Sequence, residues 1–333
     1  MTFLIPTTEQ ARSGLRAMKT ILASTGGLGP THREAIAAVQ KHLLRTDFDV
    51  DSLEPIEPAE LARNVTDRAL REQLVSALVT FTMLSEHVEP AHADAVDAYA
   101  RALDVAPPVV RELRDLAEQR LWRLRFDAAR RGPGPDAMRK IYEKDGALGV
   151  VKNVLGFAGV IENREIAERY HALSSYPEGS LGRTLFDFYT ARGFKFPGEK
   201  GGAPEGLLPH DLSHVIGGYD TDMRGEAHVL AFTAGYRREK VFDVLAFILV
   251  QAQHGVRLTP LADAYHGFLS TPHLVTEMVE AFARGSKCSV DLMGDWDFWA
   301  VMDHPVAELR ERYGIGPAPV RAPAAAEIAA TAS

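Results

Sequence analysis

The chain has 333 residues, 46% apolar and 25% charged, which is ordinary for a globular protein and long enough for two domains. A formal charge of -8 argues against a broadly basic, nucleic-acid-binding surface. The single cysteine, Cys288, excludes an intrachain disulfide and a cysteine-built metal cluster, so any metal site must use His, Asp and Glu.

The chain opens on Met1 to Gln10, which has neither a basic region nor a long apolar run and so does not match a secretory signal. The longest apolar stretch, Val244 to Val250, is too short to span a bilayer, which takes about 20 residues. We therefore expect a cytoplasmic protein. Peripheral contact with the inner membrane and formation of a homo-oligomer stay open.

Residues 8–131 are predicted to form a first domain made only of helices. Thr31 and Glu34 have the spacing of a capping box, so we expect them to open the second helix. Pro90 is expected to open another helix, and Pro107 and Pro108 to end it. The other expected helices cover residues 11–22, 32–44, 67–86 and 109–130.

An internal repeat relates residues 28–38 to residues 88–98 at an offset of 60, with Pro, His and an acidic residue in matching places. This pattern resembles the TerB-like (tellurite-resistance) helical domain, whose metal sites use acidic residues on the turns. The first turn, residues 26–29, has no acidic residue, whereas the second keeps Glu86 and Glu89. We interpret the acidic residues here as favouring helix N-termini through the helix dipole, and we predict no second metal site. These residues are Glu34, Glu86, Glu89 and Asp94.

A Gly/Pro-rich segment at residues 132–146 is predicted to be a linker, followed by a second helical domain over residues 147–316. The Pro/Ala-rich residues 317–333 have little to bury and are predicted to be a disordered tail. No stretch shows sustained period-two alternation, so we expect an all-α protein with two helical domains.

His210, Asp211 and His214 begin one predicted helix, and the spacing of the histidines places both imidazoles on one face. A glycine pair after them allows a turn, and Glu226 can return from the next helix. Two imidazoles and two carboxylates that converge form a divalent-metal site. The zinc-protease pattern does not fit, because its middle acid is Glu and acts as the general base.

The same four residues carry a resemblance to the coenzyme Q (ubiquinone) biosynthesis protein four family, whose signature is H-D-x-x-H, eleven residues, then E. The family's Pro-x-Gly-x-Leu-Gly-Arg run stands here at residues 177–183. The resemblance covers about residues 150–316, and the helical half before Gly132 lies outside it. It implies an all-helical domain that binds a divalent metal, usually taken as zinc, through His210, Asp211, His214 and Glu226.

The resemblance further implies a role in ubiquinone or prenylquinone biosynthesis. Two hypotheses follow. One is a metal-dependent lyase or oxidative decarboxylase that replaces the C1 carboxyl of a prenylated aromatic acid by hydroxyl. The other is a non-catalytic scaffold that binds a prenyl or isoprenoid lipid and organises other quinone-biosynthesis proteins. An open coordination position beside an apolar cavity favours the enzyme, and a closed four-ligand shell favours the scaffold. A third hypothesis makes the first domain a stress or metal sensor.

We expect His210, His214 and Glu226 to be direct ligands, and Asp211 to be either the fourth ligand or a group that orients a histidine. A prenylated substrate needs an apolar groove. Apolar residues of the predicted helix at 241–254 either line this groove or belong to the core. Arg183 and Arg224 are candidates to bind an anionic group. Four further histidines are expected to be structural or exposed: His228, His254, His266 and His273.

Overall fold

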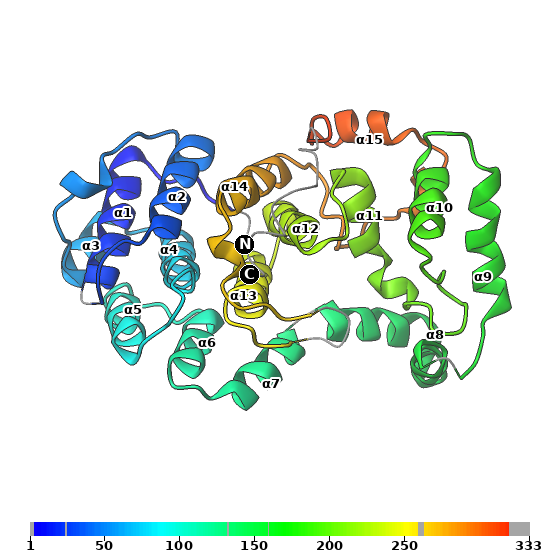
Figure 1. Cartoon of the computed structure of the whole chain (residues 1–333), viewed down its shortest axis with the longest axis horizontal. Helices are drawn as coiled ribbons and strands as arrows, with labels where there is room; N and C mark the ends of the chain where they lie inside the picture. Colours follow the sequence, from blue (N-terminus) through cyan, green and yellow to red (C-terminus); the bar gives the residue numbers. More distant parts are fainter. Residues whose placement is uncertain (1–2, 24, 132, 159, 259–262, 320–333) are drawn as a thin grey trace, which may run out of the picture.

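The computed structural model describes residues 3–23, 25–131, 133–158, 160–258 and 263–319 (Figure 1). The prediction of an all-α protein is confirmed: over these ranges the chain is helical with no strand, and the only β-type pairings are two isolated bridges. One bridge joins Ser180 to Pro305 and the other joins His254 to His266. The predicted disordered tail falls largely on residues 320–333, which lie outside the described residues.

The described part of the N-terminal half contains seven α-helices: α1 (Thr8–Ala23), α2 (Pro30–Val39), α3 (Pro58–Asn64), α4 (Arg68–Thr82), α5 (Pro90–Ala102), α6 (Pro108–Ala117) and α7 (Leu121–Arg131). A five-residue π-helix, Gln40–Leu44, extends α2. The single helix expected over residues 109–130 was wrong, because the chain breaks between α6 and α7, where Gln119 has a left-handed backbone with φ of 56°.

The capping box expected at Thr31 was also wrong. Gly29 is the N-cap of α2 and Pro30 is its first residue, a position where the missing N–H costs nothing. Glu34 instead accepts hydrogen bonds from the backbone nitrogen and the hydroxyl of Thr276, both at 2.9 Å. An acidic residue that resembled a local cap therefore joins the N-terminal half to a helix far along the chain.

The internal repeat has a structural counterpart in a reciprocal exchange of hydrogen bonds. Ser85, in the second turn, contacts the Nε2 of His32 at 3.2 Å, and Thr25, in the first turn, contacts the Nε2 of His92. Both hydroxyls and both imidazoles are related by the offset of 60 residues. Each copy thus holds the histidine of the other.

Between residues 133 and 319, the described ranges contain eight more α-helices: α8 (Pro133–Phe157), α9 (Arg164–His171), α10 (Leu181–Arg192), α11 (Leu208–Gly217), α12 (Met223–Tyr236), α13 (Val241–Ala252), α14 (Leu274–Gly285) and α15 (Val306–Arg312). The segment predicted as a linker, residues 132–146, enters α8 from residue 133 onward. This helix departs from helical geometry at Gly146, where φ is 66°. The predicted linker therefore has helical structure, and the division into two domains stays a prediction.

Helices α12 and α14 cross at two glycines. A Cβ on Gly235 would lie 2.2 Å from the carbonyl oxygen of Phe282, and one on Gly285 would lie 2.1 Å from that of Phe232. The two backbones can approach this closely only because both side chains are absent. In Figure 1, α12, α13 and α14 lie between the blue N-terminal helices and the green helices α8 to α11.

The two halves share one apolar core, in which buried residues of α1 to α6 are continuous with those of α10 to α15. Polar contacts support this junction, since Gln253 donates to the carbonyl of Leu84 at 3.1 Å and His254 bonds that of Met83 at 2.8 Å. The described helices include none long and apolar enough to cross a membrane.

Candidate metal centre

Helix α11 presents both predicted histidines. Pro209 occupies its first turn, and Gly218 ends it in the left-handed conformation with φ of 75°. His210 and His214 lie one turn apart, as expected from their spacing. The terminal carbonyls of α11 are bound by two arginines: Arg310 donates to Ile216 at 2.7 Å and Arg284 donates to Gly217 at 2.6 Å. Cationic groups at this end stabilise the helix that carries the histidines.

Glu226 lies in the first turn of α12. The N-cap of this helix is Asp222, whose carboxylate accepts a hydrogen bond from the backbone nitrogen of Gly225 at 2.7 Å. Gly225 lies against the preceding turn, because a Cβ there would be 2.1 Å from the carbonyl oxygen of Asp220. The cap and the glycine together fix the turn from which Glu226 points back at α11.

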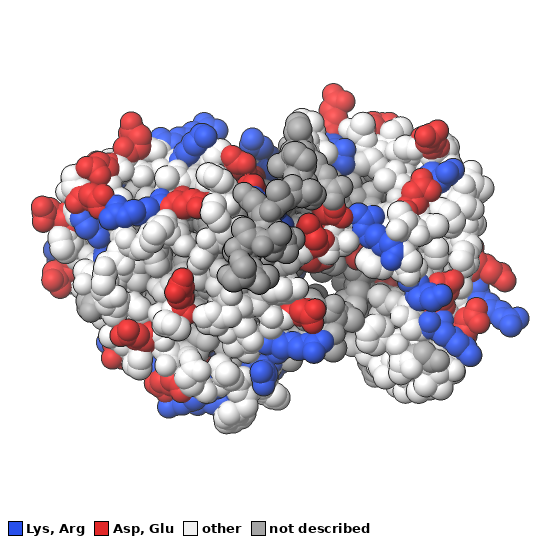
Figure 2. Space-filling view, viewed as in Figure 1, with Lys and Arg blue, Asp and Glu red and all other residues white. Residues whose placement is uncertain are grey.

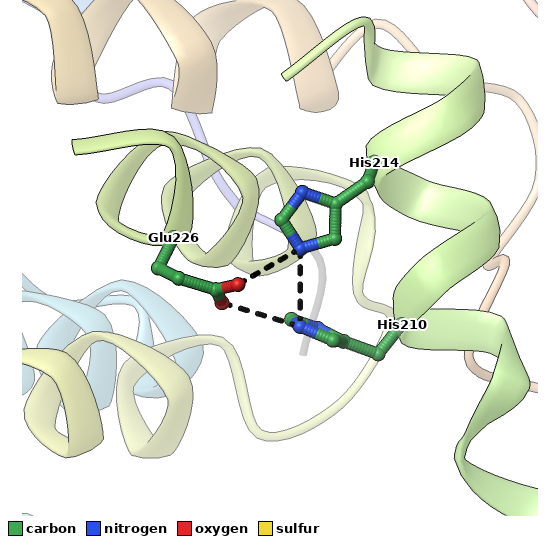
Figure 3. A group of neighbouring side chains, drawn as sticks. All are labelled: His210, His214 and Glu226. Atoms are coloured by element: carbon green, nitrogen blue, oxygen red, sulfur yellow. Dashed lines mark hydrogen bonds and ion pairs between the residues drawn. The ribbon is translucent and has the colours of Figure 1, made fainter. Parts of the chain in front are cut away.

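The three side chains converge on one point (Figure 3). The Nε2 atoms of His210 and His214 lie 3.3 Å apart, and each lies 3.3 Å from a different carboxylate oxygen of Glu226. Zinc bound tetrahedrally at about 2.0–2.1 Å holds neighbouring nitrogen and oxygen ligands about 3.3–3.4 Å apart. The donor set and its spacing therefore fit one face of such a site.

The same proximity shifts the pKa values of the group. Burial alone would raise the pKa of Glu226, but hydrogen bonds and the charges of the two imidazoles outweigh it and lower the pKa to about 2. Burial would likewise lower the pKa of His210, but the Glu226 carboxylate outweighs it and raises that pKa. The Glu226 carboxylate therefore stays ionised, and the proton that it favours on His210 must leave before that imidazole can bind a cation.

Asp211 is beside the cluster but outside it. The ligand atoms that lie within 4.8 Å of one another belong to His210, His214 and Glu226. The Asp211 carboxylate instead accepts a hydrogen bond from the hydroxyl of Tyr189 on α10. Burial and the Asp211 charge raise the pKa of Tyr189 far above its ordinary value, so the phenol keeps its proton and donates it. Nothing in the sequence linked Tyr189 to a residue 22 positions away.

A cavity of about 1610 Å³ opens beside the cluster. All four predicted residues line it, together with Tyr189. Apolar side chains from several helices line much of the rest, among them Leu230, Val244, Phe247, Phe157 and Phe194, and charged side chains such as Arg139, Glu143 and Lys240 line it as well. The molecular surface is hollowed between the central helices and the α8–α10 side (Figure 2). A cavity of this size and character suits a long apolar ligand with a polar head at the cluster.

The apolar helix at residues 241–252 serves both roles considered from the sequence. Val244 and Phe247 line the cavity, Leu245 and Leu249 face the N-terminal helices, and Ile248 borders both sides. The helix is therefore a wall of the cavity and a part of the core.

The other candidate residues lie elsewhere. Arg183 pairs with Asp187, and Arg224 makes two hydrogen bonds to Glu277, which His228 also contacts at 2.9 Å. Neither arginine lines the cavity. The remaining histidines, His254, His266 and His273, are outside the cluster, in keeping with structural roles.

Comparisons with known proteins add little. No protein family and no curated protein matches this chain. A crystal structure of a "putative ubiquinone biosynthesis protein" from Nostoc punctiforme is similar over 76% of this chain and 100% of its own, with 18% identity and a TM-score of 0.33. A likeness this distant decides neither the fold nor the activity of this chain.

Proposed function

We propose that this protein is a divalent-metal protein of prenylquinone biosynthesis that binds a prenylated aromatic acid in the large cavity. The observation that carries the proposal is the set of three 3.3 Å separations among His210, His214 and Glu226, at the side of a mainly apolar cavity. Three protein donors with a fourth position facing a cavity are typical of catalytic zinc sites, whereas structural sites are closed.

The reaction that fits is loss of the ring carboxyl. The bond between the ring carbon and the carboxyl carbon breaks, CO₂ leaves, and the electron pair left on the ring takes up a proton. A bound divalent cation would orient the carboxylate and stabilise the developing charge. Replacement of the carboxyl by hydroxyl requires, in addition, a two-electron oxidant: with dioxygen, water would supply the hydroxyl oxygen and dioxygen would leave as hydrogen peroxide. The pair Tyr189–Asp211 lines the same cavity and is placed to hold or move a proton there.

The alternative function, a lipid-binding scaffold, uses the same cavity without chemistry. The enzyme and the scaffold differ in the fourth coordination position of the metal, which is open in the enzyme and filled by a protein ligand in the scaffold. Because Asp211 is hydrogen-bonded to Tyr189 and lies outside the three-residue cluster, the geometry favours the enzyme.

Metal analysis tests the proposal. We expect the purified chain to contain about one equivalent of zinc or a similar divalent ion, together with an extractable prenyl lipid, and Glu226→Gln to lose the metal. Glu277→Gln is the matched control, because Glu277 also contacts a histidine, His228, but no second one. If the wild-type chain binds no divalent metal, or if Glu226→Gln retains it as Glu277→Gln does, the proposal is wrong.

The proposal includes peripheral membrane contact through α7 and α8. Nine of the twelve exposed large apolar side chains in the described residues lie between positions 122 and 160, including Trp122, Phe126 and Leu148. An exposed apolar surface of this kind marks an interaction site. Leu124 and Phe157, from the same two helices, line the cavity, so an isoprenoid could pass from a bilayer into it.

Sedimentation with vesicles of phosphatidylcholine and phosphatidylglycerol tests the membrane contact. We expect the double variant Trp122→Ser and Phe126→Ser to lose most of the binding seen for the wild-type chain. Ile5→Ser is the matched control, because Ile5 is similarly exposed but lies near the N-terminus, before α1 and outside α7 and α8. Equal loss with Ile5→Ser, or none with the double variant, would place the contact elsewhere.

A further inference from the structure

A second cavity, of about 220 Å³, lies between the N-terminal helices and the central helices. Side chains of α1, α2 and α4 form one side, and side chains of α12, α13 and α14 form the other. Protein cores leave few voids larger than a water molecule. A cavity of about 150 Å³ lined by apolar side chains already binds benzene. The space at this junction is therefore large enough for a small molecule.

The lining is almost wholly apolar, and its three polar side chains are hydrogen-bonded to the backbone. Gln73 exchanges two hydrogen bonds of 2.6 Å with the backbone of Leu4. Gln10 accepts from the backbone nitrogen of Thr7 at 3.0 Å, and Thr80 donates to the carbonyl of Ser76 at 3.1 Å. A charged or strongly polar ligand would find few partners here, and burying its charge would be unfavourable.

Several large apolar side chains around this cavity are only partly buried, although they belong to the core. Met18, Leu74, Phe242 and Leu245 are examples. Apolar surface that remains accessible where two sets of helices meet is typical of ligand sites. Residues 3–6 close one side, where Phe3 contacts the ring of Phe282 edge-on at 5.3 Å.

From these observations we propose that this cavity is a second ligand site, separate from the metal centre, that binds a small uncharged hydrocarbon-like molecule. The proposal does not depend on the function proposed for the metal centre. Helix α13 separates the two cavities, and Ile248 borders both. A test must therefore show in which cavity a probe binds.

The methionines provide that readout. Met18 and Met278 line the small cavity, whereas Met223 and Met293 line the large one. In a chain carrying methyl-labelled methionine, titration with n-butylbenzene is expected to shift the NMR signals of Met18 and Met278 and to reach saturation. Phenylbutyrate has the same carbon skeleton with a carboxylate, and we expect it to bind at least about tenfold more weakly. Met18→Leu and Met278→Leu assign the two signals.

Filling the cavity supplies the control. Ala77 lines it from α4 and is half-buried, so Ala77→Phe is expected to abolish the shifts of Met18 and Met278 without unfolding the chain. If its helicity by circular dichroism falls, Ala35→Leu is the second filling variant. Saturable shifts confined to Met223 and Met293, no saturable shift at all, or unchanged binding in a folded filling variant would overturn the proposal.

Discussion

Two pairs of histidines lie in the two halves of this molecule, and their surroundings make them opposite in character. In the N-terminal half, His32 and His92 are held by the hydroxyls of Ser85 and Thr25. Burial, together with the charge of His92, lowers the pKa of His32 to about 4, and burial lowers that of His92. In the other half, a carboxylate raises the pKa of His210.

The comparison teaches that two imidazoles alone do not make a metal site, because the partner of each ring also decides what a histidine pair can do. A hydroxyl is a neutral hydrogen-bond partner and leaves the pair uncharged. Glu226 supplies a negative charge between His210 and His214, and all three donors then point at one place. Neutral imidazoles and a carboxylate are ligand types that zinc prefers, whereas the neutral hydroxyls of Ser85 and Thr25 are not.

The largest expected difference between the pair His210–His214 and the pair His32–His92 is the effect of their substitution on zinc affinity. We expect His210→Ala and His214→Ala each to lower zinc affinity by more than about 100-fold, because removal of groups that only support ligands already costs about 10–100-fold. His32→Ala and His92→Ala should leave it unchanged. Competition with a chromophoric chelator measures all four. A comparable loss of affinity in a folded His32→Ala variant would show that the N-terminal half also binds the metal.

The N-terminal pair, and His32 above all, should contribute to the pH dependence of stability. The unfolded chain binds a proton at His32 near pH 6.5, whereas the folded chain binds one only near pH 4. Stability from this residue is therefore complete above pH 6.5 and is lost as the pH falls from 6.5 towards 4. The expected loss is on the order of 2–3 kcal/mol.

Urea unfolding between pH 7 and pH 4 measures this loss. His254, whose pKa is also lowered to about 4 by burial, contributes over the same range, so the wild-type curve reports both. His32→Gln should therefore flatten the dependence in part, even if the variant is less stable at every pH. An unchanged slope in His32→Gln would show that its imidazole is not kept neutral by the fold.

Asp211 sharpens the comparison, since it follows His210 in the chain but bonds to Tyr189. We expect Asp211→Asn to lower zinc affinity about tenfold, because a charge beside the cluster is lost while the three donors remain. Tyr189→Phe should have an equal or smaller effect. A loss as large as that of His210→Ala would instead make Asp211 the fourth ligand, which would favour the scaffold over the enzyme.

Much of the helical order followed from the sequence, because proline at helix starts and apolar residues at helical spacing act locally. Pro90 does begin α5, and the helices expected near residues 11–22 and 241–254 are present. The convergence of His210, His214 and Glu226 was also predictable, since a glycine pair and a short turn join their helices. These features depend on residues close together in the chain.

The features that could not be predicted from the sequence depend on contacts between residues far apart in the chain. Glu34 has the position of a helix cap, but its partner is Thr276. The sequence left Asp211 as either a ligand or a group that orients a histidine, and no local pattern showed its hydrogen bond with Tyr189. The small cavity forms where α12, α13 and α14 pack against α1, α2 and α4. Each of these depends on which surfaces meet after folding, and no local pattern records that.

The smallest expected effect concerns the exchange of hydrogen bonds between the two repeats. Ser85→Ala leaves the buried Nε2 of His32 without its partner, which should destabilise the chain by about 1 kcal/mol. Thr25→Val does the same to His92. Because the two contacts are equivalent through the repeat, we expect similar losses in urea unfolding. Equal losses in the free energy of unfolding would show that both turns stabilise the fold to the same extent. A loss confined to one variant would show that the two contacts, although equivalent in sequence, do not contribute equally to stability.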